Sequence, residues 1–166
     1  MNLPKKEKSY TEKEALLKIA AYCTYQERTQ QEVRNKLYEY GLKKDSIEEI
    51  IVKLLSENFI NEERFAKTYA GGKFRIKKWG RKKISEALKQ KDISEYCIKK
   101  ALQEIDSHEY VKILTELLKK QNKKLTDKNI FVRKRKLAQY LMGKGYESEL
   151  VWDVLNEAIG EELETH

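Results

Sequence analysis

The sequence contains few of the residues that interrupt regular structure. It has one proline, Pro4, and seven glycines among 166 residues. Sandwiches and barrels of β-strands need many turns, which glycine and proline usually supply, so the composition argues against both folds. Lys, Glu, Leu and Ile are abundant instead, and this balance favours helices. We therefore expect an all-α protein.

Residues that bind metals are also scarce. The chain has two cysteines, Cys23 and Cys97, and two histidines, His108 and His166. A structural zinc site needs about four such ligands, so we expect no metal and no cofactor. Both cysteines fall in apolar helical patterns, which indicates small core residues in a reducing compartment. His108 has no recognisable catalytic partner and no glycine-rich phosphate loop occurs, so we do not expect an enzyme.

Long apolar runs are absent too. No stretch approaches the roughly 18 apolar residues that a membrane span requires. The first residues, Met1 to Lys6, lack the apolar segment typical of a secretion signal. We therefore expect a cytoplasmic protein without a membrane partner. Apolar residues make up 40% of the chain and charged residues 37%, which favours small packed units over one large core.

Positive charge is concentrated in the middle of the chain. Residues 1–72 carry 13 Lys and Arg against 12 Asp and Glu, and residues 73–136 carry 21 against 8. Residues 137–166 carry 1 against 7, so the net charge of the whole chain is +8. A basic middle indicates a polyanion or an acidic protein as partner. The alternative is that these charges only keep exposed helices soluble.

Apolar positions recur at offsets of 51 and then 53 residues. Val33, Ile84 and Leu137 form one such set. The turn residues Gly41, Asp92 and Gly145 keep the same register, as do four further apolar sets: Leu37, Leu88 and Leu141; Ile47, Ile98 and Val151; Ile51, Leu102 and Leu155; Leu54, Ile105 and Ala158. The recurrence predicts three tandem three-helix repeats, at 11–57, 61–106 and 107–159, and a polar tail at 160–166. Units of about 45 residues fold poorly alone, so we expect them to share apolar surface in a short curved helical solenoid.

Helix boundaries follow from capping residues. Thr11, Thr29 and Ser46 each precede a glutamate by three residues, which is the pattern of a capping box. Gly41 and Asn58 are expected to end two of the helices in left-handed conformation. Asn61, followed by Glu62 and Glu63, could be imagined as a metal ligand, but a helix N-terminus favours the same residues, so we interpret it as a cap.

Two basic runs are the candidate binding sites. Clustered cations bind phosphates, and interleaved aromatic rings can stack on bases. The first run comprises Lys73, Arg75, Lys77, Lys78, Arg81, Lys82 and Lys83. The second comprises Lys119, Lys120, Lys123, Lys124, Lys128, Arg133, Lys134, Arg135 and Lys136, and we expect its last four residues to be mostly exposed. The alternative for both runs is a solvated helix face.

Other residues of these segments allow two interpretations each. Phe74 and Trp79 are expected to be core anchors, and stacking on bases is the alternative. Arg81 to Lys83 follow the helix-breaking Gly80, where cations oppose the helix dipole, so an anionic partner is indicated. The acidic residues near the C-terminus are expected to complement a helix N-terminus and aid solubility, or else to cover a basic surface: Glu147, Glu149, Asp153, Glu157, Glu161, Glu162 and Glu164.

Taken together in order, these motifs resemble the RecX family of bacterial regulators of the RecA recombinase. The central signature is the run Phe59 to Ala66, followed by Tyr69, Gly80, Ile84 and Leu88. The opening repeat resembles the family through Arg28, Glu32, Val33, Leu37 and Gly41, and the closing repeat through Arg135, Leu137, Tyr140, Leu141, Gly145, Tyr146 and Val154. Asn58 and Asp92 stand where the family usually has glycine and Asn61 where Asp is common, and all three residues suit such turns or caps.

The resemblance implies a non-enzymatic modulator that binds RecA or the RecA–DNA filament. Such a protein mostly inhibits recombinase, ATPase and coprotease activity, and acts in DNA repair, recombination and the SOS response. It implies that the basic runs face RecA or DNA, with weak, non-specific binding to bare DNA, and we expect a monomer. The alternative is a DNA-binding protein that is non-specific or of helix-turn-helix type.

Overall fold

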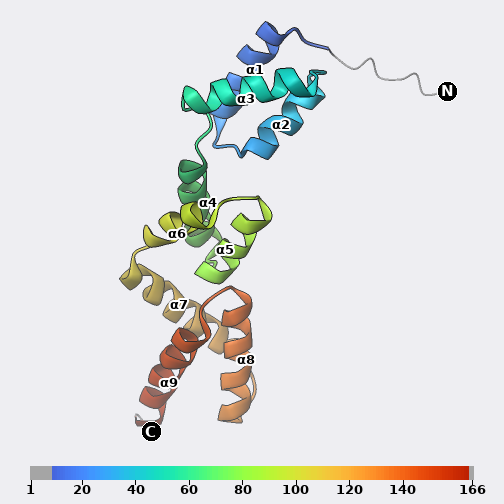
Figure 1. Cartoon of the computed structure of the whole chain (residues 1–166). Helices are drawn as coiled ribbons and strands as arrows, with labels where there is room; N and C mark the ends of the chain where they lie inside the picture. The colour runs from blue at the N-terminus through green and yellow to red at the C-terminus, as the bar shows by residue number, and fades with distance from the viewer. Residues whose placement is uncertain (1–8, 165–166) are drawn as a thin grey trace, which may run out of the picture. The chain divides into compact units, whose positions relative to one another are not determined.

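The computed structural model describes residues 9–164, with side chains through Ile159, and every regular element among them is an α-helix (Figure 1). No strand occurs in this part of the chain, which confirms the all-α prediction. The helices are α1 (Glu12–Tyr25), α2 (Gln30–Glu39), α3 (Lys44–Ser56), α4 (Glu62–Lys77), α5 (Arg81–Gln90), α6 (Glu95–Gln103), α7 (Ser107–Asn122), α8 (Ile130–Gly143) and α9 (Ser148–Glu164). Because α9 extends to Glu164, most of the predicted polar tail is helical, and His166 lies outside the described residues.

The chain forms two compact units, and the boundary between them falls inside α4. Unit 1 ends at Thr68 and contains α1, α2 and α3. Unit 2 begins at Tyr69 and contains the second part of α4 and the helices from α5 to α9. Each unit has its own buried residues, so each is described by itself.

The helix caps follow the sequence with one exception. Thr29 and Glu32 form the reciprocal capping box, since each side chain accepts a hydrogen bond from the other residue's backbone N–H, at 3.1 and 2.8 Å. Thr11 accepts a hydrogen bond from the N–H of Glu14, at 3.2 Å. The prediction for Ser46 was wrong, because α3 begins earlier, at Lys44, without a side-chain cap. The Ser46 hydroxyl instead donates to the carboxylate of Glu12 on α1.

The turns adopt the predicted left-handed conformation. Gly41 and Gly145 have φ angles of 83° and 99°. Asn58 and Asp92 have φ angles of 63° and 59°. Their short polar side chains tolerate this region better than other side chains do. The same turn therefore follows α2, α5 and α8, although the residues differ.

The repeated apolar positions lie in equivalent places. Leu37, Leu88 and Leu141 are each fully buried, and so are Val33, Ile84 and Leu137. Cys23 and Cys97 are buried as expected. The equivalence is not complete: Leu102 is half-buried, whereas its counterparts Ile51 and Leu155 are buried. Ala158 is also half-buried.

Candidate nucleic-acid and partner interface

The first basic run spans the end of α4 and the start of α5. Arg75, Lys77, Lys82 and Lys83 are exposed, and Arg75, Lys77 and Lys82 make no ion pair within the part of the chain that the structure describes. Ile76, between two of these cations, is 78% exposed. We call Arg75, Ile76, Lys77, Lys82 and Lys83 the α4–α5 surface. It combines positive charge with one apolar side chain.

The two aromatic residues of this run differ in burial. Phe74 is buried, which confirms it as a core anchor. Trp79 is half-buried, and the ammonium groups of Lys73 and Lys83 lie 4.9 and 4.8 Å from the centre of its ring. The ring is therefore already engaged by two cations of the chain itself. This arrangement gives no support to stacking of a base on Trp79.

Arg81 has an anionic partner within unit 2. Its Nη1 lies 3.4 Å from Oε1 of Glu147, and its guanidinium lies 3.8 Å from the centre of the Tyr110 ring. The Tyr110 hydroxyl accepts a hydrogen bond from the backbone N–H of Arg81, at 3.0 Å, and donates one to Oε2 of Glu147, at 2.8 Å. Burial raises the pKa of Tyr110 far above its ordinary value, so the hydroxyl keeps the proton that it donates. Glu147 thus covers a basic residue, which was the alternative interpretation of the acidic segment.

The backbone around Gly80 and Gly145 joins α5 to the turn after α8. The N–H of Gly80 donates to the carbonyl of Lys144, at 2.8 Å, and the N–H of Lys82 donates to the carbonyl of Gly145, at 2.9 Å. A Cβ on Gly80 would lie 2.3 Å from the backbone of Gly145, so no larger residue fits here. Because carbonyl oxygens already satisfy these N–H groups, the start of α5 tolerates its three cations.

Tyr110 and Tyr146 also hold the start of α5 against the turn after α8, and the sequence analysis assigned this role to neither of them. Both side chains are buried, with ring centres 5.0 Å apart, and Phe74 lies 5.8 Å from Tyr110. The Tyr146 hydroxyl donates to the carbonyl of Lys78, at 2.9 Å, where the backbone has a φ of 58°. A tyrosine suits a buried contact between helices where one hydrogen bond is needed, because its ring is apolar and its hydroxyl is polar. The two tyrosines were therefore the sequence feature that could have indicated this contact.

The second basic run divides into exposed and half-buried residues. Arg133 is half-buried and donates to the carbonyls of Asn122, Leu125 and Asp127, at 3.1, 3.3 and 2.8 Å. Lys134 is also half-buried, and its Nζ donates to Oδ1 of Asn156, at 3.3 Å. The expectation that Arg133 to Lys136 are mostly exposed was wrong for these two residues. Arginine can satisfy several carbonyls at once, so Arg133 holds the loop between α7 and α8.

The remaining cations of this run face solvent. Lys136 is exposed but bound to Asp127, with Nζ 2.8 Å from Oδ2, and this hydrogen bond lowers the pKa of the Asp127 carboxyl. Phe131, at the start of α8, is 78% exposed. We call these exposed cations, together with Phe131, the α7–α8 surface: Lys119, Lys120, Lys123, Lys124, Lys128, Phe131, Arg135 and Lys136.

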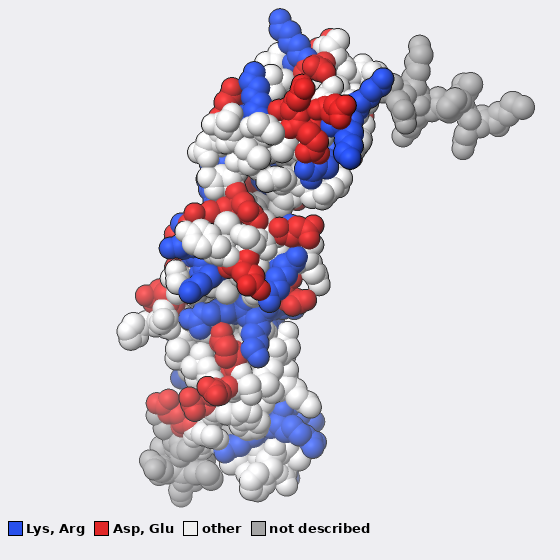
Figure 2. Space-filling model, in the orientation of Figure 1, with Lys and Arg blue, Asp and Glu red and all other residues white. Residues whose placement is uncertain are grey.

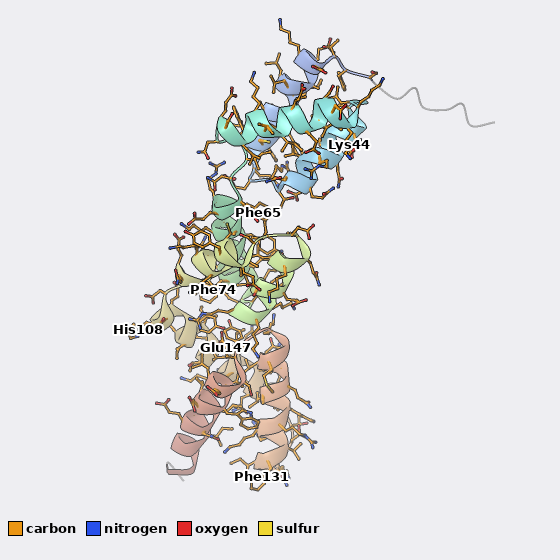
Figure 3. The ribbon with its side chains drawn as sticks, in the orientation of Figure 1. Lys44, Phe65, Phe74, His108, Phe131 and Glu147 are labelled. Atoms are coloured by element: carbon orange, nitrogen blue, oxygen red, sulfur yellow. The ribbon has the colours of Figure 1, made fainter. Side chains whose placement is uncertain are left out.

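The structure does not merge the two surfaces into one patch. The α4–α5 surface adjoins the turn after α8, near Glu147, and the α7–α8 surface surrounds the start of α8, near Phe131 (Figure 3). A helix of 14 residues rises about 20 Å, so the two surfaces lie at opposite ends of that length. Figure 2 shows a separate group of basic side chains over α8.

The candidate metal-binding and catalytic residues either have a structural role or lie alone. Asn61 caps α4, since its Oδ1 accepts a hydrogen bond from the N–H of Arg64 at 2.9 Å. His108 is exposed in the first turn of α7. Among residues 9–164, no group of three or more His, Cys, Asp or Glu is placed to hold a metal. None of the described helices combines the length and apolarity needed to cross a membrane.

Comparisons with known proteins cover most of the chain. Residues 15–54 match the family model described as the first three-helix domain of RecX, residues 61–102 the second, and residues 108–155 the third. The crystal structure of RecX from Lactobacillus salivarius superposes with a TM-score of 0.80 at 25% identity, covering 88% of this chain and 95% of that one.

Curated proteins named Regulatory protein RecX are also similar. The protein from Clostridium acetobutylicum is 35% identical over 81% of this chain and 64% of its own length. The protein from Prosthecochloris aestuarii is 28% identical over 89% and 95%, respectively. This chain spans about half the length of the Bacillus cereus relatives, of which 53% is covered at 28% identity. With three consecutive domain models matched in order, the chain belongs to the RecX family of regulatory proteins.

Proposed function

We propose that this protein binds RecA or the RecA–DNA filament in the cytoplasm and mostly inhibits its recombinase, ATPase and coprotease activities. The observation that carries the proposal is the pair of cationic surfaces on unit 2, each with one exposed apolar side chain, held about 20 Å apart by α8. Two separated contacts favour a polymer over a small ligand, because the second contact forms at a high effective concentration once the first has formed. The protein acts as a monomer without catalysis of its own.

The charges of α3 and α9 argue against a helix-turn-helix mode for the first and third repeats. In α3 the exposed face carries Asp45 and Glu49, and in α9 it carries Glu149 and Asp153. Carboxylates in a recognition position repel phosphates, which dominate the affinity for DNA. Bare DNA is therefore expected to bind weakly and without sequence preference. About six neutralised phosphates correspond to a slope of roughly −5 for log affinity against log salt.

The test measures RecA-catalysed strand exchange and ATP hydrolysis at increasing amounts of this protein. Inhibition is expected well below equimolar ratios, because a filament binder affects subunits that it does not touch. Charge reversal of Lys120, Lys124 and Arg135 to Glu removes the α7–α8 surface without disturbing the loop that Arg133 holds, and should abolish inhibition. Reversal of the exposed unit 1 residues Lys13, Lys43 and Lys53 is the matched control.

Each outcome decides between the functions. If the parent protein leaves every RecA activity unchanged, regulation of RecA is excluded for this chain. If the α7–α8 variant inhibits as well as the parent, the contact lies elsewhere. Tight, salt-insensitive binding to one DNA sequence would establish the helix-turn-helix alternative instead.

A further inference from the structure

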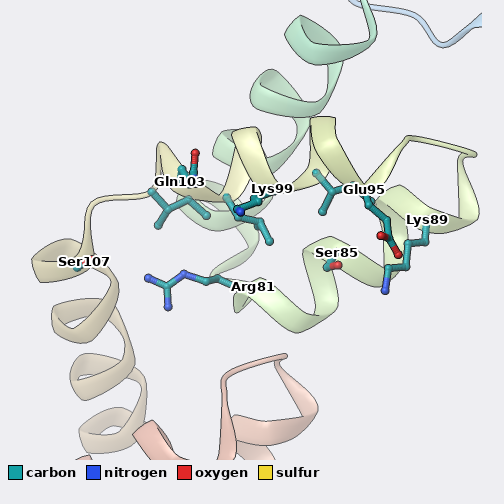
Figure 4. Close-up of a pocket in the computed structure, with 10 residues that line it drawn as sticks. Arg81, Ser85, Lys89, Glu95, Lys99, Gln103 and Ser107 are labelled. Atoms are coloured by element: carbon teal, nitrogen blue, oxygen red, sulfur yellow. The ribbon is translucent and has the colours of Figure 1, made fainter.

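A hollow of about 680 Å³ lies between α5 and α6 in unit 2 (Figure 4), and other residues of α5 line it than line the neighbouring hollow at Lys82 and Lys83. One wall is a stripe of α5 at helical spacing, Arg81, Ser85 and Lys89. The opposite wall and floor come from α6, with Lys99 at the rim and Ile98 and Leu102 beneath. A volume of this size suits several side chains of a ligand.

The corresponding level of the first repeat is bridged by an ion pair. By the repeat offsets, Ser85 and Lys99 correspond to Arg34 and Glu48, which form an ion pair across α2 and α3 with Nε 2.8 Å from Oε1. In the third repeat the corresponding residues are Ala138, which is buried, and Trp152, which is 37% exposed.

The second repeat has residues that cannot form the ion pair of the first. Ser85 is too short to reach across, and Lys99 offers no carboxylate. The consequence is visible at Leu102, which is half-buried where Ile51 and Leu155 are buried. The hollow is therefore an apolar site that this repeat leaves open.

We propose that this groove is a docking site for an acidic peptide segment of a partner protein, one that inserts an aliphatic side chain between flanking carboxylates. Arg81, Lys89 and Lys99 line it against one carboxylate, Glu95. Because Arg81 is already paired with Glu147, the two lysines provide the charge that complements an acidic ligand. The aliphatic floor accepts a leucine or isoleucine, as in grooves that hold amphipathic helices. This site is separate from the proposed RecA-regulating surfaces and does not require RecA to be the partner.

The lining also argues against a nucleic acid as the occupant. Single strands are held by aromatic rings on which bases stack. No aromatic residue lines this hollow, whereas Trp79 lines the neighbouring one of about 520 Å³ between α5 and the end of α8. A phosphate backbone would also leave the aliphatic floor without a partner.

The experiment uses a fluorescent synthetic peptide of Asp and Glu with leucines at helical spacing, titrated with the full chain. The key variant, Ser85→Arg with Lys99→Glu, copies the Arg34–Glu48 ion pair into the second repeat and should close the groove. Peptide binding is expected to weaken at least about tenfold, and about as much in Ser85→Trp, which fills the hollow. Both variants should keep the helical circular dichroism of the parent.

The controls match charge and bulk outside the groove. Lys77→Gln makes the same net change in charge as the double variant, and Ala87→Trp adds the same bulk to α5 in the neighbouring hollow; both should bind the peptide like the parent. A peptide with serine in place of leucine should bind at least about tenfold more weakly, since the floor then gains no apolar contact.

Four results would overturn the proposal. These are no binding of the peptide, equal binding by the groove-closing variants, equal binding of the serine peptide, and displacement of the peptide by an oligothymidine that the same variants fail to bind. Methyl resonances of Leu102 and Ile98 provide an independent measurement, because they should shift on peptide addition in the parent and not in Ser85→Trp.

Discussion

Helices α2 and α5 are each ten residues long, and each is followed by a residue in left-handed conformation, Gly41 in one case and Asp92 in the other. Both bury a leucine at the same position, Leu37 and Leu88. Between α2 and α3, however, Arg34 and Glu48 form an ion pair, and between α5 and α6 a hollow remains. The first and second repeats therefore have the same backbone arrangement but different surfaces.

The difference shows which positions of a repeat are free to change. Fully buried positions keep their size because neighbouring atoms leave no space. Positions between two helices that contact solvent, such as the half-buried Ser85 and the exposed Lys99, tolerate any residue whose polar groups are satisfied there. Binding sites that differ between repeats are expected at such positions.

The largest expected effect tests the shared core. Leu37→Ala in the first repeat and Leu88→Ala in the second should each lower the free energy of unfolding by roughly 2–5 kcal/mol, because both side chains are fully buried. Urea denaturation followed by circular dichroism measures the change. A loss below about 1 kcal/mol at either position would show that the two leucines are not equivalent.

A second pair of variants compares two turns with the same backbone conformation. Gly41→Ala and Gly145→Ala both place a side chain at positive φ, which costs roughly 1–2 kcal/mol. A Cβ on Gly145 would also lie 2.6 Å from the backbone nitrogen of Lys83, so this variant should lose about 3 kcal/mol or more. Hydrogen exchange at the amides of Gly80 and Lys82 should speed up in Gly145→Ala and stay unchanged in Gly41→Ala.

The ion pair of the first repeat predicts a difference in pH dependence. The hydrogen bond from Arg34 lowers the pKa of the Glu48 carboxyl. Its stabilisation is therefore present above the unfolded pKa of glutamate, about 4.3, and is lost as pH falls through the lower folded value. Arg34→Ser should remove this part of the acid dependence of unfolding.

The reciprocal variant adds the same ion pair to the second repeat. Ser85→Arg with Lys99→Glu should add acid dependence to the second repeat in the same range of pH. Thermal unfolding between about pH 5 and pH 3 measures both variants. Identical profiles for the parent, the loss variant and the gain variant would contradict the assigned role of the pair.

The smallest expected effect concerns Asp92. Asp92→Gly relieves a left-handed non-glycine residue but adds freedom to the unfolded chain, so we expect a gain of about 0.5 kcal/mol or less. Gly41→Asp, the reverse change in the first repeat, should cost about 1 kcal/mol. Differential scanning calorimetry resolves both. If Asp92→Gly were strongly destabilised, the Asp92 carboxylate would have to make a stabilising contact of its own.

Local and periodic features of the sequence were sufficient for the fold. The capping box of Thr29, the left-handed turn at Asn58 and the buried set Leu37, Leu88 and Leu141 all depend on residues close in the chain or on a repeated spacing. Helix propensity, caps and apolar period act within a few residues, so they can be read directly. The early start of α3 shows the limit, because Ser46 has the capping pattern but contacts Glu12 instead.

Only the tertiary structure determines whether a charged residue lies free at the surface or is paired within the protein. The sequence places Arg81 and Arg133 in basic runs, yet Arg81 pairs with Glu147, 66 positions away, and Arg133 holds backbone carbonyls of a loop. The groove at Ser85 and Lys99 was equally absent from the sequence pattern. An arginine carries the same charge in a contact between helices as on the surface. Which of these two places it occupies depends on segments that are distant in the sequence and that packing brings together.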